Sequence, residues 1–412
     1  MTLTETFMGM LFIILVVIIY TINIKNIVNP LMIFILPTGI AYVLYYYYFQ
    51  SFWTISQETN AIFFIGECMF LVGYTIQSLL ASSMKKIYFG IKIQDGFKKI
   101  HFEKNYFVWF FYSIGMLMNV MTIIKLKTLG AGTPNFRDEF INIVSTLPSY
   151  VIYGKYISMF AIASLLYSYI ITGLKRIFLI PIVVGIVLTY YTANLTQART
   201  DILIVFMPIV ILFIMLKMNK NSWLAFLKYG FIGAFGLVAL YFSFLVIQVA
   251  RFGTTDVSFF SSENQTFQYI SLPLTAFDKW MVIPDLASAR HGFGLVDPLD
   301  KFLKLFHVDQ YELMFAPIGQ FNVYSYLAAP FLAFGKVGVA VVLCIAGMFN
   351  KWIFDMSKIS SYYLLFYVFF EVSVLLSFYS WQMMSTVNLY ALVYVVLLWF
   401  SERRLHENKF NY

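Results

Sequence analysis

The chain has 412 residues, of which 61% are hydrophobic and 20% aromatic, while only 12% are charged. A soluble globular domain is about 25% charged, and half that proportion cannot cover a water-facing surface of this size. The composition excludes a soluble enzyme, a disordered chain and a disulfide scaffold, and it predicts an all-α polytopic membrane protein. The apolar stretches are long and continuous, which argues against the alternating strands of a porin-type barrel.

A membrane-spanning helix needs roughly 20 apolar residues. Taken in chain order, the sequence predicts eleven such spans: 5–24, 28–49, 60–81, 106–124, 152–172, 177–195, 202–216, 229–249, 330–349, 359–380 and 385–400. No Lys or Arg precedes Lys25, so we do not expect the first span to be a cleaved signal peptide. The whole chain, 1–412, is predicted to form a single integral membrane domain.

The distribution of basic residues sets the expected orientation, because loops on the cytoplasmic side of a membrane carry more Lys and Arg. One alternating set of loops holds 17 of the 28 basic residues. Six of the other 11 lie in or just after one long segment, where the rule is weak. We therefore expect the N-terminus outside and the C-terminus in the cytoplasm. The net charge of +8 then faces anionic lipid and requires no nucleic-acid partner.

Cysteine and histidine are too few and too scattered to build a metal, haem or redox site. Cys68 and Cys344 both lie inside apolar stretches, where a cysteine is usually a small core residue. No metal-ligand spacing occurs among the four histidines, which are His101, His291, His307 and His406. We therefore expect no cofactor and no metal.

Three segments with unusual content are expected outside, over residues 125–150, 196–201 and 250–321. The last is 72 residues long, and loops of this length without a domain of their own are usually functional. Within it, Asp297-Pro298 has the pattern of a helix start. Apolar residues then follow at helical spacing: Leu299, Phe302, Leu303 and Phe306. They predict an interfacial helix near 298–307, lying flat on the membrane surface or packed on the spans.

Two arginines are expected at the height of the outer lipid headgroups. Arg199 lies between the sixth and seventh spans, next to Asp201, and Arg251 directly follows the eighth span. Ionised groups near a membrane are costly unless paired, and guanidinium is a planar fork of donors that suits phosphate. Both arginines are therefore predicted to bind a lipid diphosphate. The alternatives are an arginine that snorkels to the interface and an Arg199–Asp201 ion pair.

Arg290-His291 lies deeper in the long outer segment, where glycines on either side of Phe293 suggest a tight turn. Histidine titrates near neutrality, so His291 could accept a proton from a sugar hydroxyl, with Arg290 beside it. The alternative is an ordinary surface histidine. Arg137, in the first of the three outer segments, is a weaker candidate for substrate binding.

Two acidic residues lie inside predicted spans without a basic partner in their own helix. Glu67 is in the third span and Glu371 in the tenth. Ionisable groups at such positions indicate proton coupling or a contact with substrate.

The end of the long outer segment carries a family pattern. It reads Asn322-Val-Tyr324-Ser-Tyr-Leu327, and Phe334-Gly335-Lys-Val-Gly338 then opens the next span. These stretches resemble the oligosaccharide repeat unit polymerases of bacteria, the Wzy-type O-antigen and capsule polymerases. The resemblance extends to the topology of the whole chain, with one large external loop late in the sequence, whereas specific residues match only over short stretches.

The resemblance implies a fold like that of the C-type glycosyltransferases, in the bacterial inner membrane, with the active site facing the periplasm or exterior. The implied reaction transfers the growing glycan from undecaprenyl diphosphate to the incoming repeat unit, without a metal, in the synthesis of O-antigen, capsule or exopolysaccharide. The implied partners are the undecaprenyl-diphosphate-linked oligosaccharide, membrane lipid and a chain-length regulator protein. The implied site residues are Arg199, Arg251, Arg290 and His291, with Asn322 and Tyr324 as weaker substrate contacts. Some family members carry a paired-arginine loop, which has no counterpart here, so Arg137 is left without an assigned role.

Two other functions stay open from the sequence. An O-antigen ligase performs the same chemistry on a lipid A–core or protein acceptor, and the Asn322–Tyr326 stretch favours the polymerase over it. A flippase or secondary transporter usually shows internal repeats and helices broken at mid-membrane in both halves, and the sequence has no such symmetry. The sequence also lacks Asp-x-Asp, which fits a transferase that works without a metal.

Overall fold

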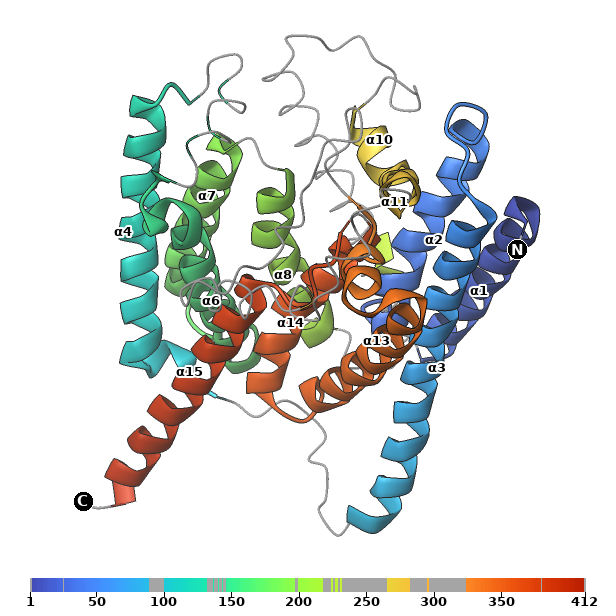
Figure 1. The fold of residues 1–412 in the computed structure, drawn as a ribbon. Coiled ribbons are helices and arrows are strands. Elements are labelled where there is room, and N and C mark those ends of the chain that lie inside the picture. Colours follow the sequence, from blue (N-terminus) through green and yellow to red (C-terminus); the bar gives the residue numbers. More distant parts are fainter. Residues whose placement is uncertain are drawn as a thin grey trace. The chain divides into compact units, whose positions relative to one another are not determined.

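The structure is a computed structural model, and its regular elements are helices throughout the part of the chain that it describes (Figure 1). The described residues are 2–24, 26–88, 100–131, 136, 140, 143, 146–196, 199–217, 224, 227–228, 230–231, 265–281, 295, 324–378 and 380–410.

Within those ranges, nine helices are long and apolar enough to cross a membrane. Seven of them lie in α1 (Leu3–Ile24), α2 (Pro30–Tyr48), α3 (Gln57–Tyr88), α4 (Tyr106–Thr128), α6 (Ser149–Thr172), α8 (Arg199–Lys217) and α13 (Ala328–Ser357). The other two combine a helix with an adjoining 3-10 turn: Arg176–Leu195 contains α7 (Leu179–Leu195), and Ser361–Phe378 contains α14 (Ser361–Leu375). These helices coincide with nine of the eleven predicted spans. The chain is therefore a polytopic α-helical membrane protein, as the composition indicates.

The two other predicted spans have different outcomes. The predicted span 229–249 lies outside the described residues except for Gly230 and Phe231. The predicted span 385–400 forms the first part of α15 (Thr386–Phe410), which continues into a charged C-terminal stretch and is not among the nine.

Short helices connect the long ones. Three are single 3-10 turns: η1 (Phe102–Lys104), η3 (Arg176–Phe178) and η6 (Leu376–Phe378). Two more, α10 (Gln265–Ser271) and α11 (Pro273–Met281), lie in the long segment 250–321 and were not predicted from the sequence. The interfacial helix expected near 298–307 lies outside the described residues.

The chain divides into two compact units. Unit 1 contains residues 1–94, 257–356 and 373–389, and unit 2 contains residues 95–256, 357–372 and 390–412. The single membrane domain expected from the sequence stays a prediction, and the two units are described separately below.

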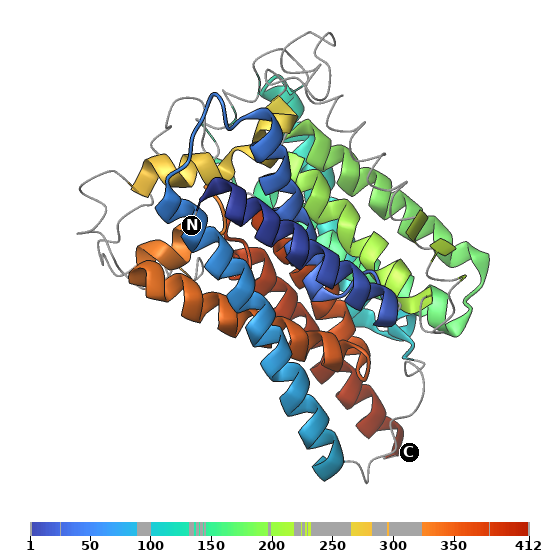
Figure 2. The same cartoon turned by 90° about the vertical axis from the view of Figure 1, so that its right-hand side faces the viewer.

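In unit 1, α1 lies beside α2 and α3, as two perpendicular views show (Figures 1 and 2). Helix α2 begins with two favourable residues. Asn29 Oδ1 accepts a hydrogen bond of 3.1 Å from the Met32 backbone N–H, and Pro30 occupies the first helical position. Between α2 and α3, the rings of Phe34 and Phe70 stack with their centroids 4.0 Å apart.

Helices α3 and α13 of unit 1 approach each other at two glycines. A Cβ atom placed on Gly73 would lie 1.9 Å from the carbonyl oxygen of Cys344, and one on Gly347 would lie 2.1 Å from that of Phe70. Only glycine permits backbones this close, and small residues are the usual means by which membrane helices pack tightly.

Gly335 kinks α13 within the Phe334–Gly338 stretch. Its φ of 69° and ψ of −158° lie in a region of backbone conformation that is essentially restricted to glycine. Three residues later, a Cβ atom on Gly338 would lie only 2.4 Å from that of Phe334. The two glycines of the Phe334–Gly338 stretch therefore shape the start of this helix.

Asparagine is expected to destabilise the protein at Gly335 but not at Gly173, because the two glycines adopt different backbone conformations. Gly335→Asn should lower the free energy of unfolding by about 1–3 kcal/mol, because asparagine does not adopt that φ/ψ region. Gly173→Asn should be nearly neutral. Gly173 ends α6 in the ordinary left-handed conformation, with φ 66° and ψ 39°, which asparagine tolerates. Denaturant unfolding of both purified variants in detergent measures the difference, and equal stabilities would contradict the kink.

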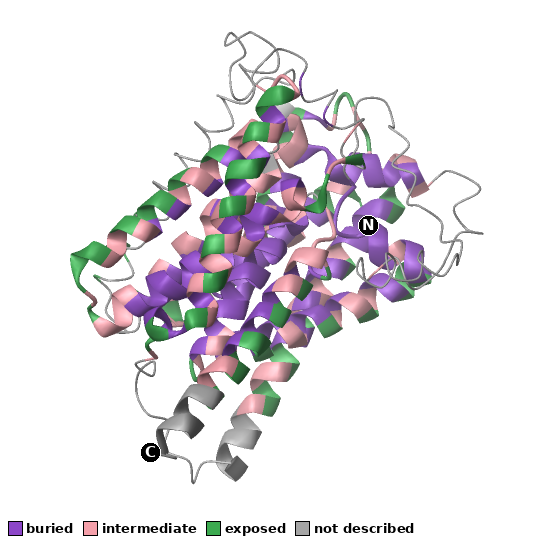
Figure 3. Cartoon of the chain, turned by 90° about the vertical axis from the view of Figure 1, so that its left-hand side faces the viewer, coloured by how far each residue is buried: buried purple, intermediate pink, exposed green. Residues whose placement is uncertain are grey.

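In unit 2, α6 is the central helix and packs against α4, α7 and α8. In the apolar part of α6, 78% of residues are buried, against 22% in that of α4, so α4 is much less enclosed than α6 (Figure 3). A buried polar contact joins three of these helices. Asn119 Nδ2 of α4 donates to Ser158 Oγ of α6 at 2.9 Å and to Thr189 Oγ1 of α7 at 3.2 Å.

Candidate functional site at the start of α8

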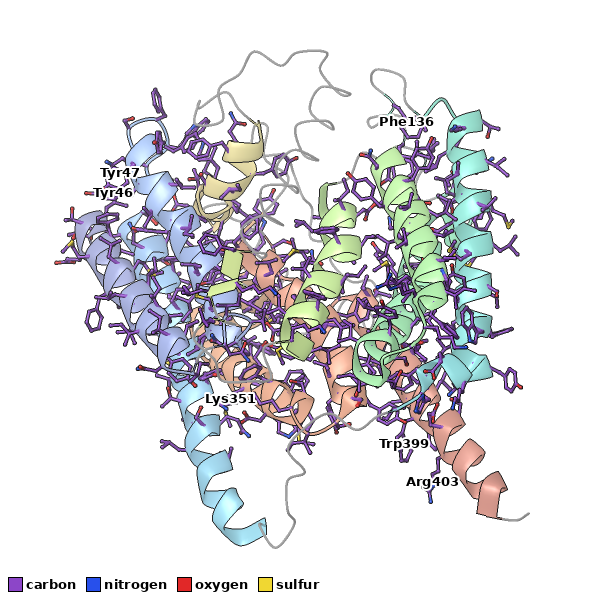
Figure 4. All side chains as sticks on the ribbon, turned by 180° about the vertical axis from the view of Figure 1, so that it is seen from behind. Tyr46, Tyr47, Phe136, Lys351, Trp399 and Arg403 are labelled. Atoms are coloured by element: carbon purple, nitrogen blue, oxygen red, sulfur yellow. The ribbon has the colours of Figure 1, made fainter. Side chains whose placement is uncertain are left out.

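One end of unit 2 is held together by an apolar cluster of Leu126, Phe136, Phe140 and Val151. These residues connect the last turn of α4 to the first turn of α6, with Phe136 at that end (Figure 4). Leu195, at the end of α7, packs against the same cluster. The end of α4, the start of α6 and the end of α7 therefore meet at one end of this unit.

Helix α8 begins at this end, with Arg199 as its first residue. Two residues later, Asp201 lies in the first turn, where a carboxylate interacts favourably with the helix dipole. The carboxylate accepts three further contacts: Lys155 Nζ at 2.5 Å, the Thr196 hydroxyl at 2.8 Å and the Tyr156 hydroxyl at 3.2 Å. The first turn of α8 is thus tied to α6 through Asp201.

Lys155 is the residue here that sequence reasoning missed. Its side chain is only 4% exposed, and that of Asp201 is 15% exposed. Removing two charges from water is costly, so a buried ion pair depends on close geometry and on further hydrogen bonds such as those from Thr196 and Tyr156. The available signal was a lysine inside the predicted span 152–172, because an ionisable residue in a span is by default a functional candidate.

The Lys155–Asp201 pair predicts that removing one charge destabilises the protein more than removing both. Lys155→Met should lower the free energy of unfolding by about 3 kcal/mol, because it leaves the Asp201 carboxylate buried without its cation. The double variant Lys155→Met/Asp201→Asn should recover most of that loss, since it removes both charges and keeps an acceptor for the hydroxyls. Denaturant unfolding in detergent measures both values, and a Lys155→Met variant as stable as the natural chain would contradict the pairing.

Further basic residues gather at this end of unit 2. Lys125 and Lys127 lie in the last turn of α4, and the Lys127 ammonium is 5.7 Å from the centre of the Tyr191 ring near the end of α7. With Arg199 and the positive end of the α8 dipole, they give this end a chemistry that suits an anion.

Among the predicted site residues, Tyr324 of unit 1 is the one whose side chain the structure describes. It is 2% exposed, and its ring lies 5.9 Å from that of Trp280 in α11. Burial raises the pKa of the Tyr324 hydroxyl, so the group is neutral at physiological pH. Its role in substrate binding stays a prediction.

Within unit 1, Asp278 links α11 to the start of α3. Asp278 Oδ1 accepts from the Ser56 backbone N–H at 2.9 Å and from the hydroxyls of Ser56 and Thr59, each at 2.6 Å. Because Ser56 directly precedes α3, these bonds fix part of the long segment 250–321 onto the start of a membrane helix. Sequence spacing gives no sign of a contact between residues so far apart.

The remaining predicted site residues lie outside the described residues: Arg137, Arg251, Arg290, His291 and Asn322. For Arg199, the structure describes the backbone at the start of α8.

Comparison of the chain with protein-family models, with curated proteins and with solved structures finds no match.

Proposed function

We propose that the chain is a polymerase of lipid-linked oligosaccharide repeat units, of the Wzy type. It is a membrane glycosyltransferase that acts at the outer face of the bacterial inner membrane. Its substrate is an oligosaccharide linked to undecaprenyl diphosphate, and its product is O-antigen, capsule or exopolysaccharide.

The observation that carries this proposal is the arrangement around Asp201. The bonds from Lys155, Thr196 and Tyr156 to Asp201 hold the first turn of α8, where Arg199 begins the helix. A rigidly held helix N-terminus with an arginine is suited to a phosphate group, since the free backbone N–H groups and the guanidinium both donate.

The proposed reaction breaks the bond between the anomeric carbon of the growing glycan and the diphosphate oxygen. A hydroxyl oxygen of the incoming repeat unit forms the new bond to that carbon. Undecaprenyl diphosphate leaves with the developing negative charge, which Arg199 and Arg251 stabilise as fixed donors. The hydroxyl proton passes to His291, with Arg290 beside it as a further diphosphate ligand.

The proposed site requires that the α7–α8 turn and the segment 250–321 face the outside. A reporter enzyme fused after Ser262 should be active only outside the cytoplasm, and one fused after Lys409 only inside it. Measuring both fusions in intact cells tests the orientation. If either result is reversed, the arginines face the cytoplasm and the proposed site is wrong.

Deleting the gene in its native host separates the polymerase from its two rivals. For a polymerase, single repeat units still reach the surface and attach to their acceptor, but no polymer forms. For a ligase, polymer accumulates on undecaprenyl diphosphate without reaching its acceptor. For a flippase, repeat units stay on the cytoplasmic side. Gel analysis of surface glycan and of extracted lipid-linked glycan distinguishes the three outcomes.

A further inference from the structure

A surface cavity of about 340 Å³ lies in unit 1, between the first turns of α3 and the kinked part of α13. Its volume is at the lower end of the range for small-molecule sites in proteins, which is about 300–1,000 Å³. The cavity is lined by Gln57, Glu58, Ala61, Ile62, Ile65 and Lys336. Because two opposite charges stand beside apolar side chains, the lining suits an amphiphile.

The two charged residues of the cavity lie where two membrane-crossing stretches begin. The apolar span of α3 is Gln57–Ala81, so Glu58 is its second residue. Lys336 directly follows the kink at Gly335, and α13 continues from there to Ser357. Charged side chains at the ends of membrane helices lie at the level of the lipid headgroups. The cavity is therefore placed to meet a headgroup and not the hydrocarbon core of the membrane.

The two charges are available to a ligand. Lys336 Nζ lies 2.9 Å from Glu58 Oε1, and the two side chains are 62% and 51% exposed. An ion pair this exposed contributes little to stability, so it opens readily for another partner. The ammonium and the carboxylate together carry no net charge. They complement a zwitterion whose phosphate meets Lys336 and whose cation meets Glu58, which exchanges one ion pair for two.

Apolar surface continues from the cavity along both helices. The helices stay together beyond it, since Gly73 of α3 packs against the backbone of Cys344 in α13. Exposed apolar residues follow at helical spacing on each helix: Ile65, Val72 and Ile76 on α3, and Val337, Val341 and Ile345 on α13. An acyl chain attached to the headgroup therefore has apolar side chains to lie against.

The paired charges discriminate between lipids. An anionic headgroup such as that of phosphatidylglycerol finds a counter-charge in Lys336 but is repelled by Glu58. Undecaprenyl diphosphate carries more negative charge still, so this cavity is not the diphosphate site. Phosphatidylcholine is a zwitterion, but its quaternary ammonium has no N–H to donate. A primary ammonium does donate, and hydrogen bonds between ionised groups are the strong ones.

We propose that this cavity binds the headgroup of one phospholipid that carries a primary ammonium, the chemistry of phosphatidylethanolamine. Lys336 binds the phosphate, Glu58 accepts hydrogen bonds from the ammonium, and the acyl chains lie along α3 and α13. The bound lipid joins the starts of these two helices. The site does not depend on the proposed glycosyl transfer, because Glu58 and Lys336 have no role in that reaction.

Native mass spectrometry of the purified full-length protein, stripped of lipid in detergent, tests the site. Phosphatidylethanolamine, phosphatidylcholine and phosphatidylglycerol with identical acyl chains are added separately. The natural chain should bind its first phosphatidylethanolamine about 10-fold more tightly than either of the others, which is the usual value of a hydrogen bond to a charged group. The same lipid should also raise the unfolding temperature most.

Three variants make the test specific. Glu58→Gln removes the negative charge at nearly constant shape, so it should abolish the preference for phosphatidylethanolamine over phosphatidylcholine. Lys336→Met removes the partner of the phosphate, so it should weaken the binding of both lipids. Glu5→Gln is the matched control, since Glu5 is also an exposed acid in the first turn of a membrane helix of unit 1. It should bind all three lipids like the natural chain.

Three outcomes would contradict the proposed lipid site. Equal affinity of the natural chain for phosphatidylethanolamine and phosphatidylcholine would show that the ammonium is not recognised. Tighter binding of phosphatidylglycerol would show a site for anionic lipids, in which Glu58 has no part. A Glu58→Gln variant that keeps the full preference would place the ammonium elsewhere. Because the preference is a ratio measured within each variant, a general loss of stability does not obscure it.

Discussion

Replacing either Arg199 or Arg251 with alanine is expected to abolish polymer formation while single repeat units still reach the surface. The leaving diphosphate develops negative charge as the glycosidic bond breaks, and donors held in place are worth most at that moment. Arg199 begins α8, and the first turn of α8 is tied to α6 through Asp201. Loss of its guanidinium should therefore remove transition-state stabilisation and leave the helix intact.

Two further variants sharpen this prediction. Arg199→Lys and Arg251→Lys should restore little polymer, because a point charge cannot reproduce a planar bidentate fork. Arg176→Ala is the matched control, since Arg176 lies in η3, before the opposite end of α7. Gel analysis of surface glycan, corrected for the amount of each variant in the membrane, gives the result. Normal polymer in both alanine variants would exclude the diphosphate role.

Replacing His291 with glutamine is expected to lower turnover by about 10²–10⁴-fold, which is the usual contribution of a general base. The acceptor hydroxyl has a pKa far above neutral, so a nearby base assists as the new bond forms. Histidine has the intrinsic pKa closest to neutral among the side chains of the segment 250–321. The variant should still insert into the membrane and still bind its lipid donor.

A second histidine in the same segment provides the control. His307→Gln should leave the rate of polymer formation unchanged. If His291→Gln also makes polymer at the normal rate, the base is a carboxylate, for which Asp285 and Glu312 are the rivals, or the reaction uses no protein base. Alanine variants of both acids, assayed for polymer length and rate, then separate these two cases.

The membrane helices were predictable because their signal is local. A stretch such as 5–24 is apolar without interruption, and α1 covers Leu3–Ile24. Membrane helices satisfy their backbone hydrogen bonds within the segment, so length and apolar composition are enough to identify them. Their boundaries are less predictable, as in α13, which runs to Ser357 where the sequence predicts an end at 349.

The site contacts were not predictable because they join residues far apart in the chain. Asp201 lies two residues after Arg199 in the sequence, and its carboxylate binds Lys155 of α6, a partner that the sequence does not indicate. Asp278 binds Ser56 and Thr59 more than 200 residues away, and this contact holds α11 against the start of α3. Hydropathy locates such residues but does not give their partners.

The Phe334–Gly338 stretch shows an intermediate case. The sequence shows two closely spaced glycines at the start of a predicted span, but it does not show what structural role they have. In the structure, Gly335 adopts a backbone conformation restricted to glycine, and α13 bends there. A glycine in a span can serve a kink or a close helix contact equally well, and only the backbone angles distinguish them.

The most direct test of the proposed function is an assay with the purified protein in lipid nanodiscs. The only substrate is an undecaprenyl-diphosphate-linked repeat unit, supplied without metal ions or nucleotide sugars. The proposal predicts a ladder of lipid-linked oligomers that lengthens with time, with release of undecaprenyl diphosphate, and no ladder from the Arg199→Ala variant. A substrate that stays as single repeat units with the natural chain, while the protein is folded and binds it, would contradict the polymerase.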